Sequence, residues 1–312
     1  MHAHAATNTN VVSLADAPVT ARQRRTVLAV AAFLLAAFAI TVPFAQVQLP
    51  AFVSFNPSVE SIVFANDLVT SILLYSQYAI TRSRAILALA IGYLYTALIV
   101  IPHELTFPGA FTGLFGGPQS SAWLYYFWSA GTPAAVIIYA LLGNSDRADR
   151  PATGSARTTI ARSIAVVTLL VLGLSWLTTA GASLLPSLMS GDHYSNMVIY
   201  VANPLAIVVA AIAFVVLWGR RRSVLDYWLL LAMFSLILNY VVAAFFARQR
   251  FSLGFYASRG FTLVTSMIVL ALLLREMTNL YTRLARSNLM LERERGNRLM
   301  KLKRSQPRSS TK

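Results

Sequence analysis

The sequence predicts an all-α integral membrane protein, a bundle of about eight transmembrane helices. The chain is 57% hydrophobic and only 12% charged, with a mean hydropathy of +0.61, a balance that is rare in soluble proteins. Its apolar runs are long enough to cross a bilayer at about 1.5 Å per residue. Because these runs are continuous rather than alternating, they favour helices over a β-barrel.

Eight runs are expected to span the membrane. Their predicted limits are 26–46, 60–80, 84–101, 120–142, 160–185, 197–218, 225–246 and 256–276. The third run is short, because Pro102 follows it at once and proline interrupts helices. The first run could instead be a cleaved signal peptide, since arginines precede it. It is long for such a segment, however, and no clear small-residue cleavage site follows.

The segments outside these spans are polar and divide the chain into four regions. We expect a disordered cytoplasmic tail over 1–25, a membrane domain over 26–276, a connector helix over 277–300 and a basic disordered tail over 301–312.

The basic residues predict the orientation of the bundle. The net charge is +15, and with the N-terminus inside, nearly all Lys and Arg fall on the cytoplasmic side. Only Arg248, Arg250 and Arg259 fall outside. Both termini are therefore predicted to be cytoplasmic. The charge indicates contact with anionic membrane lipid rather than with nucleic acid, for which the sequence contains no motif.

A polar pair, Asn66 and Asp67, interrupts the second run. Asp67 is expected about two turns below the outer end of its helix, where a carboxylate is costly unless it is paired, protonated or facing water. Arg259, at similar depth in the eighth run, could supply a structural partner. Alternatively, Asp67 could respond to a ligand or a proton, and the two interpretations are compatible.

The third and fourth runs are joined by PHELTFPGAFTGLFGGPQSS, in which Phe and Leu alternate with Gly and Pro. A long apolar loop of this kind predicts a folded lid on the outer face. Tyr and Gln side chains within the spans could line a polar cavity beneath it, or form ordinary hydrogen bonds between helices. The candidate sensing pocket comprises Asn66, Asp67, Tyr75, Gln77, Tyr93, Tyr95, His103, Glu104, Phe107, Phe111, Gln119, Trp123 and Arg259.

A metal site is a weaker prediction. His103 and Glu104 could join Asp192 and His193 around zinc or copper if their external loops meet. Adjacent residues rarely both ligate one ion, so His103 is more simply a loop anchor, and His103 and His193 remain weak candidates. The chain has no cysteine and no histidine deep in a predicted span. We therefore expect no thiolate site, no haem and no other cofactor.

Three further features are structural or mechanical. Asp226 is expected to cap the seventh span, and Asn239 to form a hydrogen bond between helices. After the eighth span, apolar residues follow a heptad pattern that suits a short dimeric signalling helix. The heptad positions are Met277, Leu280, Leu284, Ser287 and Leu291.

Several segments, in order and spacing, resemble a membrane-associated sensor domain of the fourth MASE type. They are FANDLVTSILLYSQYAITRSRAILALAIGYLYTAL, IPHELTFPGAF, GPQSSAWLYYFWSAGTP, SVLDYWLLL and RFSLGFYASR. Such domains stand N-terminal to bacterial histidine kinases and diguanylate cyclases. The resemblance implies a multi-pass sensor of the inner (cytoplasmic) membrane, a homodimer, an unknown small ligand and a kinase or cyclase partner.

The chain as given carries none of the output motifs that the resemblance implies. After the connector it departs into KLKRSQPRSSTK, without a phosphoacceptor histidine, an ATP lid or a GGDEF-type loop. We therefore expect no enzymatic activity, and truncation, a frameshift or a stand-alone protein would each account for the ending. Two alternatives to a sensor are a small-molecule transporter or channel and a regulatory adaptor of full-length kinases.

Overall fold

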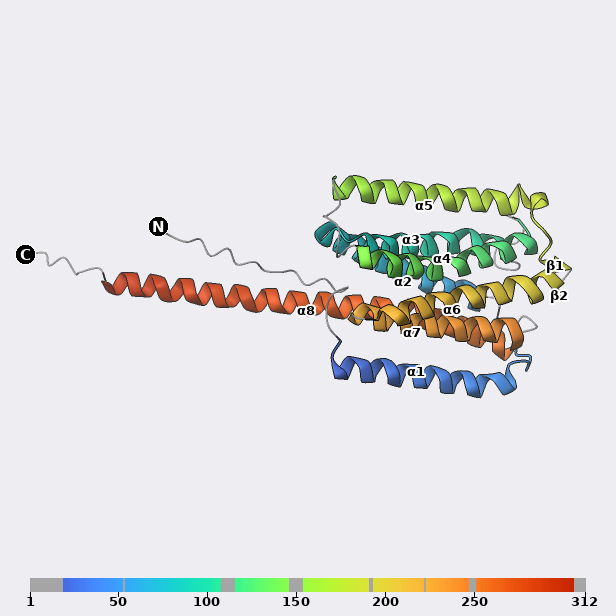
Figure 1. The fold of residues 1–312 in the computed structure, drawn as a ribbon, viewed down its shortest axis with the longest axis horizontal. Coiled ribbons are helices and arrows are strands. Elements are labelled where there is room, and N and C mark those ends of the chain that lie inside the picture. Colours follow the sequence, from blue (N-terminus) through green and yellow to red (C-terminus); the bar gives the residue numbers. More distant parts are fainter. Residues whose placement is uncertain are drawn as a thin grey trace, which may run out of the picture. The chain divides into compact units, whose positions relative to one another are not determined.

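The computed structural model describes residues 19–52, 54–107, 116–145, 154–190, 193–221, 223–246 and 251–305. Within these residues the chain forms eight helices that are long and apolar enough to cross a membrane (Figure 1). The predicted fold class is therefore confirmed. The chain divides into two compact units, and the second starts at Ala271.

The long helices follow the predicted order. They are α1 (Ala21–Thr41), α2 (Phe55–Thr81), α3 (Arg84–Thr106), α4 (Pro118–Ser145), α5 (Ala156–Thr179), α6 (Asn203–Arg220), α7 (Val224–Val241) and α8 (Leu253–Ser305). Shorter helical turns lie at Val42–Phe44, Ala182–Leu184, Val198–Ala202 and Val242–Phe246. Two short strands, β1 (Met189–Ser190) and β2 (His193–Tyr194), pair antiparallel.

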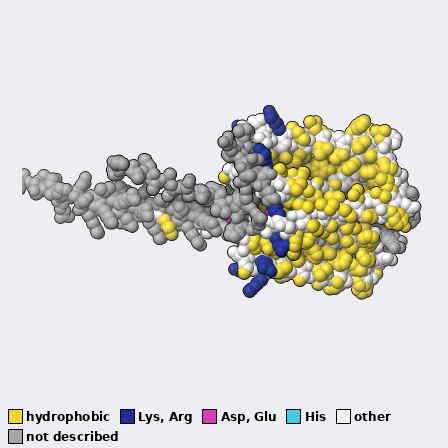
Figure 2. Space-filling view, in the orientation of Figure 1, with side chains coloured by type: hydrophobic (Ala, Val, Ile, Leu, Met, Phe, Trp, Pro, Cys, Tyr) yellow, Lys and Arg dark blue, Asp and Glu magenta, His cyan; other side chains and the backbone are white. Residues whose placement is uncertain are grey.

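The bundle has an inner and an outer set of helices. In the most apolar stretches of α3 and α7, 61% of residues are buried, against 11% in α1 and α5. α1 packs on α7 and α5 packs on α3, so these two outer helices flank the interior on opposite sides (Figure 1). The surface that remains is largely apolar (Figure 2), as a lipid-facing surface requires.

Capping boxes mark the start of two of the helices. Thr20 and Gln23 form a capping box at α1, and Ser223 and Asp226 form one at α7. The capping role predicted for Asp226 is thus confirmed. Its carboxylate also accepts a hydrogen bond of 2.7 Å from the Tyr139 hydroxyl, which ties α7 to α4.

The prediction that the third span ends at Pro102 is wrong, because α3 continues through this proline to Thr106. The Thr106 hydroxyl donates to the carbonyl oxygens of Pro102 (2.9 Å) and His103 (3.1 Å). These bonds help to satisfy backbone groups near the end of the helix, where a proline is tolerated in a membrane bundle. As a result His103 and Glu104 are helical and point inward instead of lying in an external loop.

α3 and α4 approach closely at Gly92. A Cβ atom placed there would collide with the Cβ atom of Ala135. Small residues at such crossings allow the backbones of membrane helices to pack against each other.

We predict that Gly92→Ala lowers the free energy of unfolding by about 1–3 kcal/mol, because the added methyl overpacks this crossing. Gly173→Ala is the matched control, since no atom lies within 4 Å of its Cβ position. Thermal unfolding of both variants in detergent checks the prediction. Equal stability of the two variants would contradict it.

Candidate functional site

One face of α2 carries the polar residues of the interior. Asn56, Glu60 and Asp67 recur at helical spacing and are all buried, with Val63 between them. This spacing aligns them in one row on a helix. The row meets α3, α4, α7 and α8 at two levels, one around Glu60 and one around Asp67.

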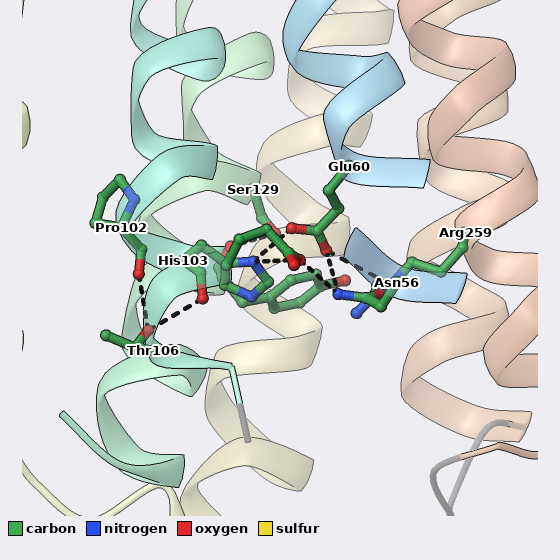
Figure 3. Close-up of polar contacts among 9 residues, drawn as sticks. Asn56, Glu60, Pro102, His103, Thr106, Ser129 and Arg259 are labelled. Carbon is green, nitrogen blue, oxygen red and sulfur yellow. Dashed lines mark hydrogen bonds and ion pairs between the residues drawn. The ribbon is translucent and has the colours of Figure 1, made fainter. Parts of the chain in front are cut away.

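Glu60 is the centre of the first level. Its side chain is fully buried, and its Oε2 atom lies 2.7 Å from Nδ1 of His103, the geometry of a strong hydrogen bond. Glu104, the next residue on α3, lies on the same side, with Oε1 3.9 Å from His103 Nδ1. Two carboxylates and one imidazole therefore meet in the interior (Figure 3).

Asn56 and Arg259 complete this level from α2 and α8. The Asn56 amide donates to Oε1 of Glu60 and to Oε1 of Glu104, both at 2.8 Å. The Arg259 Nε–H donates to Asn56 Oδ1 at 2.6 Å, and Nε lies 3.9 Å from Glu60 Oε1. Figure 3 shows the bridging position of Asn56 between the carboxylates and the arginine. We call these five residues the Glu60 network.

Aromatic rings pack around the network. The Arg259 guanidinium lies 5.5 Å from the Tyr125 ring centre and 5.0 Å from that of Phe255. The His103 ring centre lies 5.8 Å from that of Trp128. In such a setting a charge that loses its partner is not compensated by solvent, so each member of the network depends strongly on the others.

The network could also hold a metal ion. One ligand atom each from Glu60, His103 and Glu104 lies within 4.8 Å of the other two, a set that suits zinc or manganese. Two features oppose this: the Asn56 amide already occupies Oε1 of both carboxylates, and the positive charge of Arg259 lies beside them. The geometry favours a hydrogen-bonded charge network.

The second level is a cavity of about 40 Å³ next to Asp67. Its lining residues come from α2, α3, α4, α7 and α8: Val63, Asp67, Tyr93, Tyr125, Trp128, Ser129, Thr132, Leu236, Asn239, Tyr240, Thr262, Thr265 and Ser266. Tyr125 and Trp128 also contact the Glu60 network. The same two aromatic side chains therefore border both levels.

Of the polar residues predicted for the pocket, some tie helices together instead. The Tyr75 hydroxyl lies 2.9 Å from Ser163 Oγ, joining α2 to α5, and the Tyr95 hydroxyl donates to the Phe127 carbonyl on α4. Asn66 donates to Ser266 Oγ at 3.0 Å. Gln77 is half-buried and does not line the cavity.

Gln119 and Trp123 hold the segment that follows α5. Both donate to the carbonyl oxygen of Pro186, at 2.8 and 3.1 Å, and Gln119 also accepts from two backbone amides there. Phe107, the residue after α3, is buried. Phe111 with the predicted lid, and the side chain of His193, lie outside the described residues.

The prediction that Arg259 pairs with Asp67 is wrong. Arg259 pairs with Asn56 and Glu60, because it lies beside the first two turns of α2. The hydrogen bond expected from Asn239 to another helix is not formed by its Oδ1 atom, which has no hydrogen-bond partner among the described residues.

Sequence reasoning missed Asn56 and Glu60, because the second span was expected to begin only at residue 60. Extending the helical spacing of Asp67 backwards would have found both. A turn signal at Pro57 masked this pattern, although proline is acceptable in the first turn of a helix.

Removing Glu60 should destabilise the bundle, because it leaves Arg259 and His103 buried without their carboxylate. We predict that Glu60→Ala lowers the free energy of unfolding by about 3–5 kcal/mol. Ser76→Ala, on the exposed side of α2, should change it by less than about 0.5 kcal/mol. Chemical or thermal unfolding in detergent measures both. A similar stability of the two variants would refute the network as a stabilising unit.

The comparison with known families agrees with this architecture. Residues 50–281 match the model of the family described as "Membrane-associated sensor, integral membrane domain", MASE4. No curated protein and no solved structure matches the chain. The matched segment includes α2 to α7 and the part of α8 that carries Arg259. The chain is thus a multi-pass integral membrane protein and belongs to the MASE4 family of membrane-associated sensor domains.

Proposed function

We propose that this chain is the input domain of a bacterial signalling system in the inner membrane. It perceives an outer-side or membrane-derived stimulus at the Glu60 network and passes the change along α8 to a histidine kinase or cyclase partner. One observation carries the proposal: Arg259, which belongs to the network, lies on α8, the helix that continues to Ser305. The stimulus site and the exit helix therefore share one charged contact.

The distribution of arginines supports an orientation with both termini in the cytoplasm. Figure 2 shows Lys and Arg side chains gathered at one end of the apolar surface. They belong to the start of α1, the turn between α2 and α3, the start of α5 and the end of α6: Arg22, Arg24, Arg25, Arg82, Arg84, Arg157, Arg162, Arg220 and Arg221. The positive-inside rule supports a cytoplasmic position for this end, and in the proposed orientation the Glu60 network lies in the outer half of the membrane.

The network can act as a switch because its partners are exchangeable. A small polar ligand that competes for Arg259 or Asn56 would leave the carboxylates to find new donors, and α8 would shift relative to α2. Such a ligand changes the output only if it binds the two arrangements with different affinity. The energy involved is large, since every group concerned is buried.

We further propose that the output requires two copies of the chain. The heptad residues Met277, Leu280, Leu284 and Leu291 all lie within the helical part of α8. Two heptads are short for an independent coiled coil, but they suit a connector whose partner helix comes from a second copy.

The proposal is tested by fusing the chain at Leu291 to a histidine kinase whose activity depends on its input helix. We predict that Arg259→Gln changes basal kinase activity severalfold, because it releases α8 from α2. Asp67→Asn should also change the output without loss of expression. Autophosphorylation in membrane vesicles measures both effects.

Arg221→Gln is the matched control, since this arginine is exposed and stacks on Trp218 of its own helix. Its fusion should have wild-type activity. Wild-type activity in the Arg259→Gln fusion, with normal membrane insertion, would rule out signalling through this contact.

A further inference from the structure

The cavity beside Asp67 is too small for an organic ligand. Its volume is about 40 Å³, whereas pockets for drug-sized molecules measure about 300–1,000 Å³. About 10–15 Å³ holds one water molecule. The space therefore suits a small ion together with one or two waters.

Three oxygen atoms around this cavity are buried and lack a hydrogen-bond partner among the described residues. They are Asp67 Oδ1, Tyr93 OH and Asn239 Oδ1, from residues that are 4%, 4% and 2% exposed. Buried polar atoms without partners are uncommon in folded proteins. Here three of them come from three different helices, α2, α3 and α7, and line the same cavity.

Four serine and threonine hydroxyl groups in the cavity wall present lone pairs rather than protons. Each donates its hydrogen to a carbonyl of its own helix: Ser129 to Tyr125 at 2.7 Å, Thr262 to Ser258 at 3.1 Å, Thr265 to Phe261 at 2.8 Å and Ser266 to Leu263 at 2.8 Å. None of these hydrogens is left for Asp67. These four groups therefore add oxygen acceptors to the wall of the cavity.

The charge of Asp67 also lacks a cationic partner at this level. No Lys or Arg is among the described residues that line the cavity, and Arg259 contacts Asn56 and Glu60 instead. The Thr96 hydroxyl interacts with the Asp67 carboxylate, but it brings no net charge. A buried carboxylate in a membrane needs a counter-charge, a proton or an ion.

We propose that this cavity is a binding site for a sodium ion. The ligands on offer are all oxygen atoms, which hard cations prefer, and a single carboxylate balances one positive charge. Water molecules in the cavity could donate hydrogen bonds to these oxygens, but they would leave the charge of Asp67 unbalanced. A cation attracts all of their lone pairs at once.

The ion would add a contact shared by α3, through Tyr93, and by three further helices, which hydrogen bonds such as Asn66 to Ser266 already connect. Asp67 lies on α2, Asn239 on α7, and Thr265 with Ser266 on α8. Sodium binding would therefore stabilise one arrangement of these helices. The site is distinct from the Glu60 network, and an ion could bind there whether or not the network transmits a signal.

The test uses the full-length protein in lipid nanodiscs at pH 8, where protons compete little. We expect wild-type protein to bind ²²Na⁺ saturably, and its Tm to rise with NaCl but not with equal choline chloride. Asp67→Asn should abolish both effects. Glu276→Gln, which removes a carboxylate that does not line the cavity, should leave both unchanged.

Two conservative variants keep the proposal testable if Asp67→Asn does not fold. Tyr93→Phe and Asn239→Leu each remove one oxygen ligand, and each should weaken sodium affinity at least about tenfold. The proposal is overturned if wild-type protein shows no saturable ²²Na⁺ binding, or if NaCl and choline chloride raise the Tm equally. Undiminished binding in these variants or in Asp67→Asn would overturn it as well.

Discussion

The burial of Glu60 is the constraint on which the interior of this protein depends. A fully buried carboxylate is stable only if neighbouring groups replace the water it has lost. His103, Asn56 and Arg259 do so from three helices, and each of them is buried in turn. The resulting network fixes the register of α2, α3 and α8 against one another, since sliding any one of them by a turn would leave a charge unpaired.

The two polar levels of the interior differ in how their charges are balanced. Around Glu60, hydrogen bonds link the carboxylates to His103, Asn56 and Arg259, although Glu104 Oε2 has no partner among the described residues. Around Asp67, four serine and threonine hydroxyls donate to carbonyls of their own helices, and three buried oxygen atoms lack a partner among the described residues. The first level thus has a cation, Arg259, beside its carboxylates, whereas no Lys or Arg is among the described residues that line the second. Glu60 and Asp67, which lie at the centres of the two levels, project from the same face of α2.

The fold was predictable from the sequence because continuous apolar runs of about 20 residues rarely occur outside membrane spans. The site was only partly predictable. Asp67 stood out as an isolated charge within an apolar run, but Asn56 lies beside Pro57, where a loop was expected, and Glu60 lies at the first residue of the predicted span. Pro102 hid the helical state of His103 and Glu104 in the same way. A proline near a helix end looks the same in sequence whether the helix stops or continues, and tertiary packing decides between the two.

Pairing between distant residues could not be predicted from the sequence either. Arg259 and Asp67 carry opposite charges and were predicted at similar depth in the membrane, yet Arg259 forms its ion pair with Glu60. Depth along a helix is set by its first residue, and α2 begins several residues before the predicted limit. An error of about one turn in the predicted start of a helix therefore changes which residues of the facing helix lie opposite each of its side chains.

The position of Trp128 makes the protein its own optical reporter. Its indole ring lies near the His103 imidazole and also borders the Asp67 cavity. Tryptophan emission responds to the polarity and charge of its immediate surroundings, so rearrangement at either level should alter the light emitted by this one side chain. The chain has five tryptophans, and replacing the other four by phenylalanine would isolate that signal without adding a dye to the membrane domain.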